Sequence, residues 1–128
     1  LQDAGIPFEE DRFVQTRFTL SGAYESASAF FAQKPDTTAV FAMSDTVAIG
    51  VIRALKDMGR RVPEDVSIVG FDGIEMGKFF VPRLTTVEQP VDDIARESVQ
   101  LLMDMLEKGE APRHVVVEAR LQKRESVL

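Results

Sequence analysis

The chain has 128 residues, of which 45% are hydrophobic and 28% charged, with 15 Lys and Arg against 21 Asp and Glu. That length and apolar content suit one domain with a buried core and argue against intrinsic disorder. The net charge of −6 argues against a surface that binds nucleic acid through its phosphates, and the absence of Cys excludes disulfides, zinc–thiolate sites and thiol catalysis. No stretch reaches the roughly 18 uninterrupted apolar residues of a membrane span.

The first segments predict the end of a helix, then a strand, then a second helix. The acidic opening does not fit a secretion signal. It is typical of a helix that ends at Gly5 and is stopped by Pro7, and a helix without its beginning suggests a fragment of a longer protein. Residues 12–18 alternate loosely and predict a strand. The following helix is indicated by apolar residues that recur on one face: Ala23, Ala27, Phe30 and Phe31.

The middle of the chain predicts two buried strands with a helix between them. Residues 37–42 and 66–71 are short β-branched and apolar runs, typical of strands covered on both faces. Ser44 and Asp45 are suitable N-cap residues for a helix over 46–58. One face of that helix carries its apolar side chains: Val47, Val51, Leu55 and Met58.

The last third of the chain predicts one long helix between extended segments. Residues 72–83 are irregular, and 84–89 are extended. Residues 91–108 give the strongest helical pattern, and 115–117 begin a last strand ahead of a charged tail. The long helix has a broad apolar stripe: Val91, Ile94, Ala95, Leu101, Leu102, Met105 and Leu106.

Alternating strands and helices at this spacing predict an α/β fold, a three-layer sandwich with a mostly parallel sheet and helices on both faces. In open sheets of this kind, ligands bind beyond the carboxyl ends of the strands. Four groups of residues follow or end a predicted strand and are therefore the candidates: Phe18, Ser44-Asp45-Thr46, Asp72-Gly73 and Glu88-Gln89.

These candidates favour binding over catalysis. Asp45 and Asp72 could converge on one site, although Asp45 is equally suited to cap a helix, and Phe18 suits either the core or a platform for a ring-shaped ligand. No nucleophile–base constellation can be assembled, so we do not expect an enzyme. His114 is interpreted as a surface histidine without metal-ligand spacing, and no glycine-rich phosphate loop occurs. The sequence therefore predicts no cofactor and no metal.

Four blocks of the sequence form an ordered series. They are TAVFAMSDTVAIG (38–50), VPEDVSIVGFD (62–72), PRLTTVEQP (82–90) and LQKRES (121–126). In this order they resemble segments of the lactose/galactose-repressor family of bacterial transcription regulators. Phe18-Thr19 followed by Gly22-Ala23-Tyr24 also fits, although Ala23 replaces a glycine usual in the family. The resemblance extends over nearly the whole chain.

The resemblance implies the C-terminal half of a sensing domain of the type I periplasmic-binding-protein-like fold. Residues 1–89 and about 119–128 would form the C-terminal lobe, whereas 90–118 would be a helix and strand that belong to a missing first lobe. Such a cytoplasmic repressor binds a small effector, often a sugar or nucleoside, between its lobes. It contacts DNA only through an N-terminal helix-turn-helix head that this chain lacks, and it has no membrane partner. A transporter's periplasmic sugar-binding protein shares the fold and remains the alternative.

The resemblance also assigns the effector site. Phe18 matches an aromatic residue that stacks on the effector ring, and Asp72 matches an acid that accepts hydrogen bonds from ligand hydroxyls. Ser44 and Thr46 match polar contacts, with Ser44 in place of a common Asn, and Gln89 matches a residue of the hinge that faces the cleft. Asp45 is then expected to act mainly as a structural cap.

The family forms dimers through this lobe, which implies a homodimer here. Five residues are expected at the interface: Ile49, Ile52, Lys56, Phe79 and Phe80. Without the first lobe, the helix over 91–108 is expected to pack on a neighbouring chain or to fold back on its own sheet. A phosphoacceptor receiver domain has about this length and layer order, but the acidic pair and the Lys that it needs are missing from the predicted strand ends.

Overall fold

The computed structural model describes residues 3, 5–7, 9–109 and 111–128. The predicted end of a helix before Gly5 depends on Leu1, Gln2 and Ala4 and therefore lies outside the described residues. The regular elements in chain order are η2 (Glu10–Arg12), α1 (Leu20–Gln33), β1 (Ala39–Phe41), α2 (Asp45–Asp57), β2 (Ser67–Asp72), α3 (Met76–Phe79), β3 (Thr85–Glu88), α4 (Val91–Lys108) and β4 (Arg120–Gln122).

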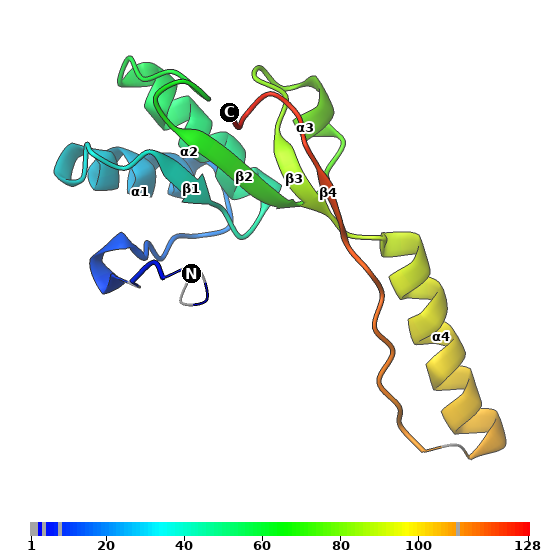
Figure 1. Ribbon diagram of the computed structural model, residues 1–128. Coiled ribbons are helices and arrows are strands. Elements are labelled where there is room, and N and C mark those ends of the chain that lie inside the picture. The colour runs from blue at the N-terminus through cyan, green and yellow to red at the C-terminus, as the bar shows by residue number, and fades with distance from the viewer. Residues whose placement is uncertain (1–2, 4, 8, 110) are drawn as a thin grey trace.

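The four strands form one sheet in the order β1-β2-β3-β4 (Figure 1). β1 pairs with β2 and β2 with β3 in parallel, whereas β4 runs antiparallel to β3. The crossover between β1 and β2 contains α2, and the crossover between β2 and β3 contains α3. The predicted mostly parallel α/β fold is therefore confirmed. The carboxyl ends of β1, β2 and β3 share one edge of the sheet, which is where such folds bind ligands.

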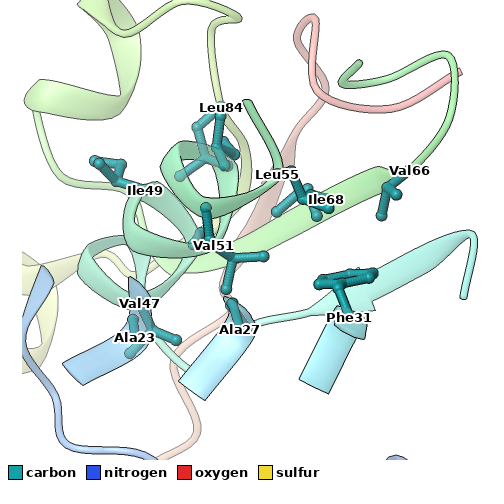
Figure 2. Packing of buried hydrophobic residues seen from close by; sticks show 14 residues of the cluster. Ala23, Ala27, Phe31, Val47, Ile49, Val51, Leu55, Val66, Ile68 and Leu84 are labelled. Carbon is teal, nitrogen blue, oxygen red and sulfur yellow. The ribbon is translucent and has the colours of Figure 1, made fainter. Parts of the chain in front are cut away.

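The hydrophobic core lies between α1, α2 and one face of the sheet. The predicted apolar faces are confirmed for Ala27 and Phe31 of α1 and for Val51 and Leu55 of α2, which are buried. Met58, predicted on the same face of α2, is instead 41% exposed just after the helix. Figure 2 shows these side chains converging with Ile68 of β2 and others of the cluster. Burial of a Leu, Ile or Phe side chain contributes about 1.5–3 kcal/mol each, so this cluster holds the helices on the sheet.

The two central apolar runs are each covered on one face only. Ile68 and Gly70 of β2 are buried, whereas their neighbours in the strand are half-buried. Phe41 of β1 is 58% exposed, and Ala39 is exposed as well. The prediction of cover on both faces is therefore wrong, because α1 and α2 pack together on one side of the sheet and β1 is an edge strand.

Residues 12–18 do not form the predicted strand. Arg12 ends the short η2 helix, and residues 13–19 are irregular. A strand requires a neighbour that pairs its backbone groups, and in the described chain these residues adjoin no strand of the sheet. The segment is held instead by Arg12, whose guanidinium donates to Asp36 at 3.1 Å and to the Thr37 hydroxyl at 3.2 Å.

The carboxyl-terminal tail crosses the sheet beyond β4 and joins two strands. The buried Ser126 hydroxyl donates to the Ile68 carbonyl of β2 at 2.6 Å and accepts from the Thr85 amide of β3 at 2.8 Å. Ile68 N in turn donates to the Ser126 carbonyl at 2.7 Å. The Arg124 guanidinium donates to the Leu84 carbonyl at 2.7 Å. The tail therefore satisfies backbone groups at the buried start of both strands.

The predicted helix over 91–108 is confirmed as α4, which projects away from the sheet beside the returning segment 111–119 (Figure 1). The predicted strand at 115–117 is wrong, because these residues pair with none of the described strands and β4 begins only at Arg120. Asp104 of α4 joins the helix to this segment by accepting from Arg113 at 3.4 Å, and it also accepts from Lys108 of the same helix at 2.7 Å. Much of the apolar stripe is exposed, with Leu106 at 73%, so α4 does not fold back on the sheet.

None of the described helices has both the length and the apolar character needed to cross a bilayer.

The loop between α2 and β2 contains a strongly perturbed carboxyl group. Asp65 accepts from the Arg61 side chain at 2.8 Å and from the Arg61 amide at 2.8 Å, and these contacts lower the pKa of Asp65 from 3.8 to about 2. We therefore expect an NMR titration of the folded protein to place the Asp65 midpoint near pH 2. The stabilising contribution is present above pH 3.8 and is lost as the pH falls towards 2.

The control for this titration is Arg61→Ala, which removes the guanidinium and should move the Asp65 midpoint back towards its ordinary value. An unchanged midpoint in Arg61→Ala would contradict the assigned cause.

Candidate functional site

A hollow of about 700 Å³ lies at the carboxyl ends of β2 and β3. It is bounded by the turn after β2, the end of β3, the first turn of α4 and the strand β4 with the residues just before it. Its lining residues are Asp72, Gly73, Ile74, Glu88, Gln89, Pro90, Val91, Asp92, Asp93, Glu118, Arg120 and Gln122. The position agrees with the strand-end rule from which the sequence candidates were chosen.

Asp72 and Gln89 meet at this hollow. The Gln89 side-chain amide donates to Asp72 Oδ1 at 2.8 Å, and the Gln89 backbone amide donates to the Asp72 carbonyl at 3.2 Å. Among the hydrogen bonds of the described residues, none reaches Asp72 Oδ2. The structure thus brings together two of the predicted site residues and leaves one carboxylate oxygen available to a ligand.

The backbone at Asp72 adopts an unusual conformation. Asp72 has φ of 116° and Gly73 has φ of 80°, so two successive residues lie at positive φ. A Cβ on Gly73 would lie 2.5 Å from Glu88 Cγ, which makes glycine necessary beside β3. Positive φ in a residue with a side chain costs about 1–3 kcal/mol and persists only where the surroundings hold it. Such strain at the mouth of a hollow is typical of binding sites.

Asp45 is the residue that holds this turn. Its carboxylate is fully buried, and Oδ2 accepts from the Gly73 amide at 2.9 Å and the Ile74 amide at 2.8 Å. Oδ1 accepts from the Thr86 hydroxyl of β3 at 2.6 Å. The prediction that Asp45 caps α2 is wrong: the N-cap is Ser44, whose hydroxyl accepts from Val47 N at 3.3 Å. Asp45 is the first helical residue, and its side chain reaches across to the neighbouring strands.

Three other predicted site residues lie away from this pair. Ser44 is buried and engaged in its cap, and Thr46 follows in the first turn of α2; neither lines the hollow. Phe18 is 69% exposed in the bend before α1, and it does not line the hollow either. Thr19, the next residue, caps α1 by accepting from Gly22 N at 3.1 Å.

The hollow is acidic. Its lining carries five carboxylates, those of Asp72, Glu88, Asp92, Asp93 and Glu118, against the single guanidinium of Arg120. Lys78 of α3 approaches Glu88 at 3.9 Å and offsets part of this charge. In the described part of the chain, no group of three or more His, Asp or Glu side chains is arranged to hold a metal ion. The arrangement is suited to accept hydrogen bonds from an uncharged ligand with several hydroxyl groups.

Sequence reasoning missed part of this lining. Glu118, Arg120 and Gln122 come from the end of the chain, where the run of valines directed attention to 115–117. Gln122 pairs in register with Thr86, and Arg120 with Glu88. The strand β4 returns antiparallel beside β3 without a crossover helix before it. The alternation of strands and helices from which the site residues were predicted therefore gave no indication of these three residues.

The chain matches the model of the periplasmic binding protein-like domain family over residues 1–127. It is 36% identical to the HTH-type transcriptional regulator MalR of Clostridium butyricum over 126 residues, which are 98% of this chain and 38% of MalR. The chain thus spans well under half the length of this relative.

Solved structures agree with this match. The transcriptional regulator CelR in complex with cellobiose superposes with a TM-score of 0.92 at 34% identity, over 98% of this chain and 38% of CelR. A LacI family regulator from Arthrobacter sp. FB24 in complex with lactose gives 0.86 at 32% identity, over 99% of this chain and 48% of that protein. These relatives are regulators rather than transport proteins. The chain belongs to the periplasmic binding protein-like domain family, in the form found in LacI-family transcriptional regulators.

Proposed function

We propose that this chain is part of the effector-sensing domain of a cytoplasmic transcriptional regulator, and that its hollow binds an uncharged sugar. The observation that carries the proposal is the Asp72–Gln89 pair at the edge of the hollow. Asp72 Oδ2 is placed to accept a hydrogen bond from a ligand hydroxyl. Contact with DNA would be made by a part of the regulator outside this chain, which agrees with the net charge of −6.

The chemistry of the hollow supports a sugar. Carboxylate–hydroxyl hydrogen bonds are among the stronger neutral–ionic contacts, and Pro90, Val91 and Ile74 offer apolar surface beside them. The excess of carboxylates in the lining disfavours an anionic ligand such as a phosphate ester. CelR and the Arthrobacter regulator were solved with cellobiose and with lactose, which suggests these two disaccharides as first probes.

The experiment is a thermal-shift titration of the full-length protein with cellobiose, lactose, single pentoses and hexoses, and nucleosides. A ligand that binds the folded state at about 100 times its Kd should stabilise it by about 2.7 kcal/mol and raise the unfolding midpoint. We expect at least one neutral sugar to do so and its phosphate ester to do so less. No shift with any of these compounds would contradict the proposal.

The projecting arm, α4 with segment 111–119, fits the same proposal. Its exposed apolar side chains include Val99 at 61%, Leu102 at 54% and Leu106 at 73%. Apolar surface of this kind is covered in a complete domain. We therefore assign residues 90–118 to the first lobe of the sensing domain, and 1–89 with about 119–128 to the second.

We further propose that the regulator is a homodimer and that α3 contributes to its interface. Met76, Phe79 and Val81 are 54%, 78% and 79% exposed in one short stretch, whereas Phe80 packs partly against the core. The expectation that Ile49 and Ile52 face outward is wrong, because they are 4% and 2% exposed in the core. Their spacing on α2 suits an inward face as well as an outward one, and in the structure both side chains belong to the buried hydrophobic cluster.

Phe79→Asp tests this interface. We expect the variant to sediment as a monomer in analytical ultracentrifugation while the wild type sediments as a dimer, because the change introduces a charge into an apolar contact. Lys56→Ala on the exposed side of α2 measures how far the interface extends. A dimer of unchanged affinity in Phe79→Asp would contradict the assignment to α3.

A further inference from the structure

We infer that Asp45 is a positioning residue for the ligand: it does not line the hollow, but its buried carboxylate fixes the turn that presents Asp72. This inference rests on the proposed function, because it concerns the same hollow. It differs from a capping role, which Ser44 already fills, and from a contact with the ligand, since Asp45 is fully buried.

The two amides that Asp45 Oδ2 accepts belong to the residues directly after Asp72. These are Gly73 N at 2.9 Å and Ile74 N at 2.8 Å. The orientation of the peptide unit between Asp72 and Gly73 is set by ψ of Asp72, so a hydrogen bond to Gly73 N restricts the backbone of Asp72 itself. The second bond fixes the next peptide unit. Together they hold the turn from inside the protein, while Gln89 holds the Asp72 side chain from the hollow.

This restraint is needed because the turn is strained. With φ of 116° at Asp72 and 80° at Gly73, a free backbone would relax to another conformation. Hydrogen bonds from amides to a carboxylate are stronger than those between neutral groups, and Asp45 lies in the first turn of α2, where the helix dipole favours negative charge. The restraint on the backbone of the turn therefore comes from a buried group that does not line the hollow, whereas Gln89 restrains the Asp72 side chain.

The sheet beneath leaves room for this contact. Asp45 Oδ1 lies over Gly70 of β2 and Thr86 of β3, which are partners in the parallel register. A Cβ on Gly70 would be only 2.2 Å from Asp45 Oδ1, so glycine at this position allows the carboxylate to reach the turn. The Asp45 side chain thus connects three parts of the fold: the start of α2 after β1, the turn after β2, and the strand β3.

Thr86 offers a matched comparison. It is as buried as Asp45 and bonds to the same carboxylate, but through Oδ1 and not through the oxygen that holds the turn. Thr86→Val should therefore lower stability and leave the turn in place. If Asp45 were only a structural residue, loss of either partner would affect the ligand in proportion to the stability that is lost.

The experiment compares the full-length wild type with Asp45→Ala, Asp45→Asn and Thr86→Val. For each we would measure affinity for cellobiose, lactose or another sugar found to bind, the urea unfolding midpoint, and hydrogen exchange of the Gly73 and Ile74 amides. We expect Asp45→Ala to weaken binding by about tenfold or more and to accelerate exchange of both amides. Thr86→Val should unfold earlier but keep its affinity and its slow exchange.

Asp45→Asn should restore most of the binding, because its carbonyl oxygen accepts from both amides while its NH₂ donates to the Thr86 hydroxyl. Wild-type affinity in Asp45→Ala would overturn the inference, as would equal losses of affinity in Asp45→Ala and Thr86→Val. If Asp45→Ala does not fold, Thr86→Val decides: retained affinity at reduced stability supports the inference, and a proportional loss overturns it.

Failure of the proposed function gives a different result. In that case the wild type binds none of the sugars, yet rapid exchange at Gly73 and Ile74 in Asp45→Ala would still show that Asp45 holds the turn. Slow exchange of both amides in a folded Asp45→Ala protein would overturn the positioning role whether or not a sugar binds.

Discussion

Replacement of Asp72 by alanine is expected to weaken sugar binding by the full-length protein strongly while the fold is retained. The side chain is half-buried, its Oδ1 is held by Gln89, and it contributes no contact to the hydrophobic core. Each hydrogen bond to a charged group contributes about 1.5–3 kcal/mol, so the loss of the ligand hydroxyl contact at Oδ2 should weaken binding by roughly tenfold to a hundredfold. Isothermal titration calorimetry with the bound sugar measures this directly.

Two further variants make the result interpretable. Asp72→Gly removes the same side chain and relieves the strain of φ at 116°, so it should lose binding with no loss of stability. Asp92→Ala removes a carboxylate from the exposed rim of the same hollow and should retain most of the affinity. If Asp92→Ala and Asp72→Gly weaken binding equally, the loss of affinity comes from the lower negative charge of the hollow and not from a specific contact with Asp72. The site assignment would then be wrong.

Replacement of Gly70 by alanine is expected to destabilise the protein by about 3 kcal/mol or more, although only one methyl group is added. The new Cβ would lie 2.2 Å from Asp45 Oδ1 and 3.0 Å from Leu84 Cδ2, inside the buried centre of the sheet. The carboxylate must then move, which leaves the amides of Gly73 and Ile74 without their partner, and a buried unpaired polar group costs about 1–3 kcal/mol. Urea unfolding of wild type and variant gives the difference.

Gly77→Ala is the matched control for this change. Gly77 is also buried, but its Cβ would meet Leu84 at an ordinary 3.4 Å, and alanine favours the short helix α3. We expect a change within about 1 kcal/mol of the wild type. Equal destabilisation by the two substitutions would show that buried glycine positions in this protein do not tolerate added volume in general, and that Asp45 has no special part in the effect.

The fold could be predicted from the sequence wherever a segment carries its own signals. α4 begins and ends at the predicted residues, because its apolar stripe is long and Gly109 with φ of 66° ends it. α2 differs from its prediction by one residue at each end. Whether residues 12–18 and 115–117 form strands could not be predicted from their own sequence, because a strand forms only where another strand pairs with it. Composition gives no information about that neighbour.

The site could likewise be predicted only where the order of the strands along the chain determines which residues meet. Asp72 ends β2 and Gln89 follows β3, and because these strands are adjacent and parallel, the topology alone brings the two residues together. The cap preference of aspartate concealed the longer reach of Asp45, since Ser44 one residue earlier serves equally well as N-cap. That Asp45 bonds to the Thr86 hydroxyl depends on the strand order and on the absence of a side chain at Gly70. Local sequence patterns do not contain this information.

The anchoring of the tail through Ser126 limits how far the chain can be shortened without disturbing the sheet. Ser126 has no exposed surface, whereas Leu128 two positions later is 81% exposed. Loss of Ser126 by truncation would therefore free the Ile68 carbonyl and the Thr85 amide together, whereas a change at Leu128 should leave the anchoring undisturbed.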